Sequence, residues 1–262
     1  MNPFFYHILL GIIQGLTEFI PVSSSAHLVF VQNMFNVKEP QILFDVILHL
    51  GTLFAVMAYF YKDILEILKS LFCPKSSGFK MALLVVAGTI PTGVVGFLFK
   101  NYFESLFGSP AYTAAFLIVT GFILFSTKFI KVSDKQIDRF SFLDALIIGF
   151  AQAVAIAPGI SRSGITISSG IWRGIDRKLC AKYSLLLSIP AILGAVASQV
   201  KDIAFGTCSY AGPMFAGLIT AFIVGYAAIG ILVKLLMKAK FYVFSYYCWI
   251  VGTTAFIYFT KF

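Results

Sequence analysis

Long apolar runs constrain the fold of this chain more than any other feature. Six runs are each long enough to cross about 30 Å of hydrocarbon, which takes about 20 helical residues. They lie at 43–61, 80–99, 112–130, 183–200, 212–236 and 243–260. Hydrophobic residues make up 59% of the chain and charged residues 12%, whereas soluble proteins average about a quarter charged. We therefore predict an all-α polytopic membrane protein with six transmembrane helices.

Two further stretches, residues 4–35 and 141–172, are apolar at both ends but polar in the middle. Their centres read PVSSSAH and PGISRSG. Backbone that is not helical is tolerated at membrane depth only where it is buried in protein or lines a wet cavity. We predict two re-entrant helix hairpins whose polar turns face an interior site.

The second half of the chain resembles the first. GIIQGLTEFIPVSSS (11–25) is similar to GFAQAVAIAPGISRS (149–163), AVMAYFYKDI (55–64) to AVASQVKDI (195–203), and IVTGFILFSTKF (118–129) to IVGTTAFIYFTKF (250–262). Each half would hold one hairpin and three crossings, and an odd number of crossings inverts the second half relative to the first. We predict a single membrane domain, 1–262, made of two inverted-topology repeats at approximately 1–131 and 132–262.

The basic residues favour one side of this arrangement. Fifteen Lys and Arg lie in the loops 61–80, 128–140, 173–182 and 234–242, and four, Lys38, Lys100, Lys201 and Lys261, lie on the other side. The positive-inside rule then puts the loops with fifteen Lys and Arg in the cytoplasm and both termini outside. The net charge of +9 is a topology signal. No nucleic-acid partner is predicted, because the basic residues do not cluster on one soluble face.

The first polar centre combines a carboxylate, three hydroxyls and an imidazole. Gln14 and Glu18 are four residues apart, so they share one face of a helix. A proline then ends that helix, and Ser23 or Ser24 can cap the next one, with His27 one turn further on. A charged residue at membrane depth is functional or paired by default.

The second polar centre repeats this design with a cation. Pro158 and Gly159 break the chain, Ser161 or Ser163 caps the next helix, and Arg162 supplies a fixed positive charge. A helix N-terminus offers free N–H groups and a partial positive charge. Two such ends with a guanidinium between them suit a phosphate or a diphosphate.

Two alternatives stay open at this level. Glu18 and Arg162 could form an ion pair that only holds the hairpins together. Asp45 and His49, one helical turn apart, either support the site or form an ordinary structural pair.

The stretches QGLTEFIPVSSSAHL and PGISRSGIT together resemble the bacterial undecaprenyl-diphosphate phosphatase family, the bacitracin-resistance membrane phosphatases. The first family motif is Glu or Gln, three residues, Glu, and then P-V-S-S, and residues 14–24 meet it. The second, P-G-x-S-R-S-G, is met by residues 158–164, and the similarity covers essentially the whole chain. Two positions depart from the common pattern. Ala26 replaces a Gly, and Gln14 is the uncharged option, which argues against a carboxylate metal ligand there.

This resemblance implies hydrolysis of undecaprenyl diphosphate to undecaprenyl phosphate and phosphate, which recycles the lipid carrier of peptidoglycan synthesis. The predicted catalytic residues are Glu18, Ser24, His27 and Arg162. Ser24 is the candidate nucleophile, with Glu18 or His27 as its base, unless water attacks directly and Ser24 only binds phosphate. The predicted substrate-binding residues are Gln14, Ser23, Ser25, Gly159, Ser161, Ser163 and Thr166. A divalent cation, Mg²⁺ or Ca²⁺, is expected to assist, with Glu18 as its candidate ligand.

The alternative function is a lipid-phosphate or ion transporter with an anion site at the membrane midplane, because inverted repeats with broken helices also build transporters. A carrier needs anion ligands but no base or nucleophile, so the Glu, Ser, His and Arg group favours the phosphatase. The expected partners are a polyprenyl diphosphate substrate and membrane lipids. The sequence leaves open whether the chain forms a homo-oligomer and which prenyl chain lengths it accepts.

Overall fold

The fold is almost entirely helical in the computed structural model, which describes residues 2–35, 42–130, 134–199, 211–238 and 240–261. No β-strand occurs in these ranges, and a single isolated β-bridge joins Lys135 to Ile175. Lys38, Lys201 and the end of the repeated segment 195–203 lie outside the described residues. The prediction of an all-α protein is confirmed.

Twelve α-helices and two short 3-10 helices make up the described chain. The first half holds α1 (Pro3–Phe19), α2 (Ser24–Met34), α3 (Ile42–Tyr59), α4 (Tyr61–Ser70), α5 (Ser77–Leu98), α6 (Lys100–Phe107), α7 (Pro110–Ser126) and η1 (Thr127–Phe129). The second half holds α8 (Phe142–Val154), α9 (Arg162–Trp172), α10 (Arg177–Gln199), α11 (Ala211–Met237), η4 (Phe241–Val243) and α12 (Phe244–Lys261).

Each of the six predicted apolar runs coincides with a helix. Five of the described segments are long and apolar enough to cross a membrane: Ser77–Leu98, Pro110–Phe129, Arg177–Ala197, Ala211–Met237 and Phe241–Lys261. The sixth, α3, reaches that length only together with α4, and the two are bent by 73° where they meet. The polar sequence YKDILEILKS cannot continue an apolar span, so a separate helix replaces the loop expected after residue 61.

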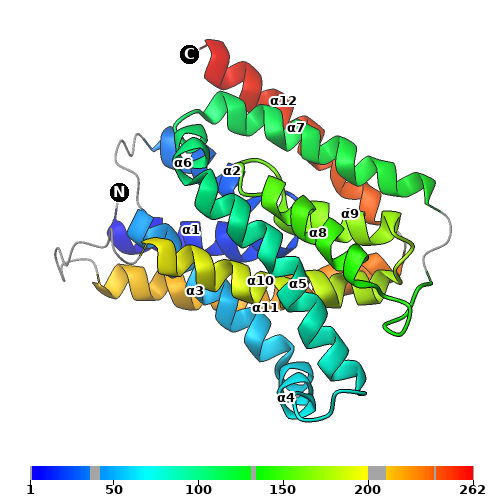
Figure 1. The fold of residues 1–262 in the computed structure, drawn as a ribbon. Helices are drawn as coiled ribbons and strands as arrows, with labels where there is room; N and C mark the ends of the chain where they lie inside the picture. The colour runs from blue at the N-terminus through cyan, green and yellow to red at the C-terminus, as the bar shows by residue number, and fades with distance from the viewer. Residues whose placement is uncertain (1, 36–41, 131–133, 200–210, 239, 262) are drawn as a thin grey trace.

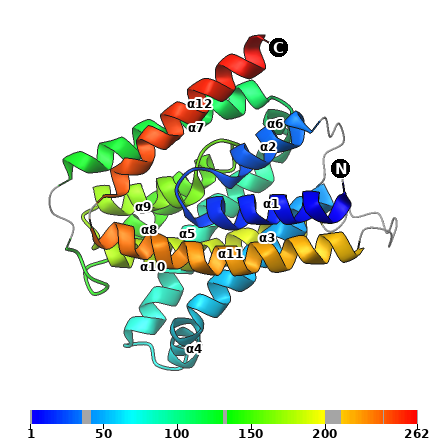
Figure 2. The same cartoon turned by 180° about the vertical axis from the view of Figure 1, so that it is seen from behind.

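The first helix of each hairpin packs against a long helix from the other half of the chain. In Figures 1 and 2, α1 runs along α11, and α8 lies against α5. Both contacts depend on glycine, because a Cβ on Gly11 would lie 2.6 Å from the carbonyl oxygen of Gly217, and one on Gly149 would lie 2.2 Å from that of Gly88. Small residues of this kind let helix backbones approach closely in membranes.

The remaining long helices close the bundle around the hairpins. α7 packs along α12, and α3 contacts both α10 and α11. The largest buried cluster joins helices from both halves and includes Phe19, Leu84, Leu117, Ile167, Leu186 and Ile229. Both hairpin turns are therefore held inside the protein, where their polar side chains are shielded from lipid.

Candidate active site

The first polar turn joins α1 to α2 and sets the position of Ser24. α1 ends at Phe19, and Ile20 is already extended, as expected for a residue that precedes a proline. Ser23 has φ +66°, in the left-handed region that costs a residue with a side chain about 1–2 kcal/mol. The Oγ of Ser23 accepts a hydrogen bond from the backbone N–H of Ala26 (3.4 Å) and caps α2. Ser23 is thus the cap, and Ser24 is the first residue of the helix.

The second polar turn joins α8 to α9 and is fixed by α7. Gly159 has φ +100°, and a Cβ at this position would lie 2.2 Å from the carbonyl oxygen of Thr113. The hydroxyl of Thr120 donates to the Gly159 carbonyl (2.9 Å) and accepts from the Ser161 N–H (3.0 Å). Ser161 Oγ in turn accepts from the N–H of Gly164 (3.1 Å), so Ser161 is the cap and Arg162 begins α9.

The two turns touch each other. The guanidinium of Arg162 forms an ion pair with Glu18 through Nη2 and Oε1, although the two residues are 144 positions apart. The side chains are 14% and 7% exposed, respectively. The N–H of Gly159 also donates to Ser25 Oγ (3.3 Å). The structure therefore brings the carboxylate of the first hairpin and the cation of the second into one site.

Three further polar side chains lie around the carboxylate of Glu18. Its Oε2 accepts hydrogen bonds from Ser24 Oγ (2.6 Å) and Gln14 Nε2 (3.1 Å). His49 Nε2 lies 3.8 Å from the same oxygen. Ser24 therefore points its proton at a carboxylate, which is the contact that a serine nucleophile and its base require.

Two polar atoms beside this carboxylate are buried without a hydrogen-bond partner in the described part of the chain. They are Oε1 of Gln14 and Nη1 of Arg162. Buried polar groups are nearly always hydrogen-bonded, and an unpaired one costs about 1–3 kcal/mol. One acceptor and one charged donor are thus available to a ligand next to Ser24.

His27 does not contact Ser24. Its Nδ1 lies 2.8 Å from the carbonyl oxygen of Ser23, and because a carbonyl only accepts, Nδ1 carries the proton. Its Nε2 lies 2.8 Å from the hydroxyl of Tyr247, and the two rings are stacked 5.7 Å apart. Both nitrogens are therefore occupied, and of the two candidate bases Glu18 is the one in contact with Ser24.

Other predicted binding residues form hydrogen bonds within the second hairpin and from it to α10. Ser163 Oγ lies 3.4 Å from Ser161 Oγ. Thr166 Oγ1 donates to the carbonyl of Arg162 (2.7 Å) and lies 2.6 Å from Ser184 Oγ. Ser163 and Thr166 are fully buried. The structure places them behind Arg162, where they support its helix, and not beside Glu18.

The Asp45 and His49 pair is joined through the backbone. His49 Nδ1 lies 2.7 Å from the carbonyl oxygen of Asp45, while the Asp45 carboxylate accepts from Gln32 Nε2 (2.9 Å). His49 thereby turns its Nε2 toward Glu18. The one-turn spacing signalled this pair in the sequence, but its orientation toward Glu18 had no sequence signal.

Two contributors to the site were not predicted. Tyr247 reaches His27 from 220 positions away, and Thr120 reaches the second turn from α7. Each stands in an apolar run and has no polar neighbour in a recognisable motif. Only the packing of α7 and α12 against the hairpins reveals them.

The protein offers a divalent cation few donors. No group of three or more His, Cys, Asp or Glu residues that could hold a metal occurs among the described residues. Two oxygen donors do lie together, the Glu18 carboxylate and the unpartnered Gln14 Oε1. Mg²⁺ is commonly held by one or two protein oxygens and by the phosphates of the substrate, so this pair fits a cation that arrives with its substrate.

Comparison with known proteins finds one family that matches most of the chain. Residues 7–254 match the family described as Bacitracin resistance protein BacA. The chain belongs to this family. The BacA match contains both polar turns and Tyr247, so every residue placed around Glu18 lies inside it.

Relatives in the BacA family are similar over nearly their whole length. A protein of Carboxydothermus hydrogenoformans is 44% identical over 254 residues, which is 95% of each chain. One of Desulforapulum autotrophicum is 42% identical over 265 residues, 95% of this chain and 96% of the relative. One of Methanobrevibacter smithii is 43% identical over 265 residues, 95% of each. All three are named undecaprenyl-diphosphatase.

Proposed function

We propose that this chain hydrolyses undecaprenyl diphosphate to undecaprenyl phosphate and inorganic phosphate. Membership of the BacA family and relatives of that name at 42% to 44% identity support the activity. The geometry at Glu18 supports the assignment of residues, because one carboxylate oxygen accepts from the Ser24 hydroxyl while the other pairs with Arg162. A base, a nucleophile and a phosphate-binding cation thus share one site.

In the first step that we propose, Ser24 attacks the terminal phosphorus. Its hydroxyl proton passes to Oε2 of Glu18, 2.6 Å away, as the Oγ–P bond forms. The bond between that phosphorus and the bridging oxygen breaks, and undecaprenyl phosphate leaves as an anion. Arg162 Nη1 donates to the phosphoryl oxygens, where negative charge must be stabilised in the transition state.

In the second step, water releases the phosphate. Glu18 first gives its proton to solvent and then accepts one from the water molecule that attacks the phosphoserine. A water O–P bond forms, the Ser24 Oγ–P bond breaks, and Ser24 recovers its proton from Glu18. The enzyme returns to its starting state.

Direct attack by water on the diphosphate would use the same residues in different roles. Glu18 would take the proton of the water, and Ser24 would hold the phosphate. The two routes differ in what remains when Ser24 loses its hydroxyl, because the carboxylate base survives that change.

A divalent cation, Mg²⁺ or Ca²⁺, fits this site as a companion of the substrate. Glu18 and Gln14 Oε1 would hold it from the protein side. When bound, it would neutralise part of the charge on the diphosphate. We expect a chelator to reduce phosphate release, and restoration by Mg²⁺ or Ca²⁺ to identify the ion.

We further propose that the two halves form an inverted-topology repeat of one hairpin and three crossings each. The reciprocal packing supports this, because α1 lies on α11 of the second half and α8 lies on α5 of the first. The helices α7 and α12, which end the two halves, pack against each other. The boundary between the halves falls near residue 131.

The membrane orientation that we propose places both termini, and the opening of the site, on the outer face of the cytoplasmic membrane. Figure 1 shows the two termini toward one end of the bundle and the α11–α12 connection at the other, which supports this arrangement. Labelling of single Cys residues from outside tests it. We expect a label on Asn2→Cys and none on Ser76→Cys, and the reverse pattern would refute the orientation.

Phosphate release by the purified protein in detergent tests the function and the nucleophile together. We expect Ser24→Ala to lose at least about a hundredfold in turnover, because either a nucleophile or the partner of a base is removed. The matched variant Ser25→Ala should lose clearly less, since Ser25 bonds the turn and not Glu18. An active Ser24→Ala enzyme beside an inactive Glu18→Gln enzyme would make water the nucleophile. Lipid binding without phosphate release in the folded wild-type protein would favour a transporter.

A further inference from the structure

Helix α4 lies at the edge of the molecule, between two membrane helices. It follows α3 after a single residue and is bent from it by 73°. Figures 1 and 2 show it beyond the ends of α3 and α5, away from α1 and α12. α5 is long and apolar enough to cross a membrane, and α3 coincides with a predicted crossing, so a helix bent by this angle from α3 lies across the direction of the crossings.

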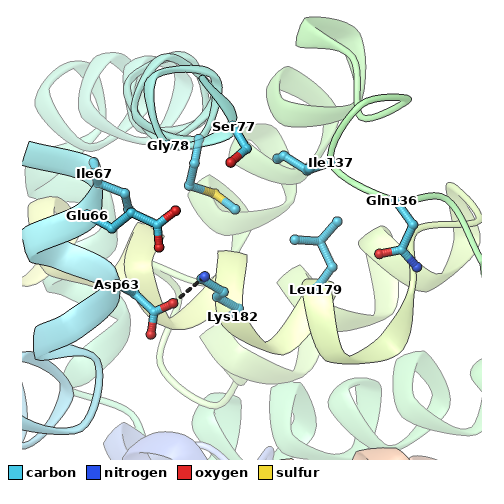
Figure 3. Close-up of a pocket in the computed structure, with 10 residues that line it drawn as sticks. Asp63, Glu66, Ile67, Ser77, Gly78, Gln136, Ile137, Leu179 and Lys182 are labelled. Carbon is cyan, nitrogen blue, oxygen red and sulfur yellow. Dashed lines mark ion pairs between the residues drawn. The ribbon is translucent and has the colours of Figure 1, made fainter. Parts of the chain in front are cut away.

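One face of α4 is turned toward the protein. Asp63 forms an ion pair with Lys182 of α10, and Figure 3 shows Asp63, Glu66 and Ile67 around the same cavity of about 160 Å³. Ile67 also packs against the main core. Gly78 lets α5 approach the end of α4, because a Cβ there would lie 2.4 Å from the hydroxyl oxygen of Ser70. Asp63 is therefore on the inner side of α4, and the exposed Glu66 borders the cavity.

The opposite face of α4 is apolar and uncovered. Its large side chains are Tyr61, Leu65 and Leu68 on the helix and Phe72 just after it. Their exposed fractions are 53%, 50%, 51% and 90%. At 100° per residue the three directions on the helix fall within about 60° of one another, so they form one continuous stripe.

Two lysines border this apolar stripe on one side. Lys62 and Lys69 are exposed and lie about 40° to 60° from Leu65 around the helix axis. An amphipathic helix with lysines beside a large apolar stripe has the composition of helices that lie in the interface of a bilayer. Lysine stems cover apolar surface there while the ammonium groups reach the phosphates.

We propose that α4 is an interfacial anchor that binds anionic phospholipids, with its apolar stripe among the upper acyl chains and Lys62 and Lys69 on the headgroup phosphates. The membrane position of the flanking helices argues for lipid as the occupant, because the bilayer surface meets this face without any further partner. Anionic lipids complement the positive charge of the two lysines. The inference does not depend on the reaction assigned to the site.

Depth-dependent quenching of a fluorescent label tests the position of α4. Two single-Cys variants on opposite faces of the helix, Leu68→Cys and Glu66→Cys, are each labelled with NBD in the full chain. The background carries Cys73→Ser and Cys208→Ser. Cys180 and Cys248 are buried and stay in place. Both labelled proteins should match the phosphate release of the parent, which shows that they are folded. In vesicles of phosphatidylcholine and phosphatidylglycerol, shallow doxyl lipids should quench the label at position 68 at least about threefold more than the label at 66, which iodide should quench instead.

Three outcomes would overturn the anchor. Equal quenching of both labels by doxyl lipid would mean that α4 is immersed, and no lipid quenching at 68 would mean that this face is in water or under a protein. Quenching that falls as protein per vesicle rises would identify a second copy as the occupant.

The dependence of quenching on lipid charge tests the two lysines separately. Phosphatidylglycerol should increase the quenching at position 68 over that in phosphatidylcholine alone. The double variant Lys62→Gln, Lys69→Gln should abolish this increase, and Lys62→Arg, Lys69→Arg should keep it, because arginine also binds phosphate. An unchanged increase in the Gln variant would refute the headgroup contact.

Discussion

The two hairpins use one backbone plan to carry opposite chemistry. Both begin their second helix after a serine cap, but the first helical residue is Ser24 in one hairpin and Arg162 in the other. With the repeats aligned as 11–25 and 149–163, Glu18 corresponds to Ile156. Two identical hairpins would place two carboxylates or two guanidinium groups face to face, and like charges at this separation repel. The difference therefore places one carboxylate and one guanidinium group in contact where the two turns meet.

The paired glutamines show the same division of roles. Gln14 and Gln152 occupy corresponding positions, and both are buried with an Oε1 that has no partner among the described residues. Gln14 donates to Glu18, whereas Gln152 donates to the hydroxyl of Thr92 (3.1 Å) on α5. The same residue thus serves the reaction centre in one hairpin and helix packing in the other.

The largest effect should come from removing the carboxylate of Glu18, which has no counterpart at the aligned position of the second hairpin. Glu18→Gln keeps the size of the side chain but cannot take a proton near neutral pH, so phosphate release should fall at least about a hundredfold. The matched control is Asp144→Asn, a buried carboxylate of the second hairpin that pairs with Lys135 and Arg173. It should lower the melting temperature in detergent while the folded enzyme keeps its turnover. Comparable loss of turnover in both variants would show that any buried ion pair matters equally.

The second hairpin should be sensitive to the shape of its cation. Arg162→Lys keeps the charge but loses the planar fork that holds Glu18 and a phosphate together, so we expect a loss of about tenfold or more in kcat/KM. Arg173→Lys is the control, since Arg173 contacts Asp144 away from the site. Near-normal kcat/KM for Arg162→Lys would reduce Arg162 to a counter-ion that holds the hairpins together.

Substitution of the two glutamines should affect different quantities, kcat/KM for Gln14 and thermal stability for Gln152. Gln14→Ala should lower kcat/KM by about tenfold, because it removes one hydrogen bond to Glu18 and one acceptor facing the ligand. Gln152→Ala should leave kcat/KM within about twofold and reduce thermal stability. Similar kinetic losses in the two variants would mean that the second hairpin also binds substrate through its glutamine.

The smallest effect concerns a contact between the first hairpin and α12. Tyr247→Phe removes the hydroxyl on His27 Nε2 but keeps the stacked ring, so we expect a loss of about threefold in kcat, in line with one neutral hydrogen bond. The control Tyr246→Phe, whose ring packs on Phe125 and Trp249, should have no effect. A loss as large as that of Glu18→Gln would instead place Tyr247 at the reacting atoms.

Sequence reasoning predicted the helices better than it predicted the contacts between them. The apolar runs predicted all six long helices, because the free energy of burying a helix in lipid is nearly a sum over its own residues. The sequence also predicted both polar turns, because proline and serine act on the backbone within a few residues. The amphipathic helix α4 was missed because its apolar stripe is too narrow to register as an apolar run.

The sequence by itself determined that this chain is a membrane protein with two broken segments, and it singled out Glu18, Ser24 and Arg162 as candidates for its chemistry. Only the tertiary structure decided that Glu18, and not His27, hydrogen-bonds to Ser24, and that Thr166 faces Ser184 of α10. These contacts depend on how each helix is rotated and on neighbours more than a hundred positions away, as between Arg162 and Glu18. Packing among helices fixes such rotations, and no pattern within one segment of the chain encodes them.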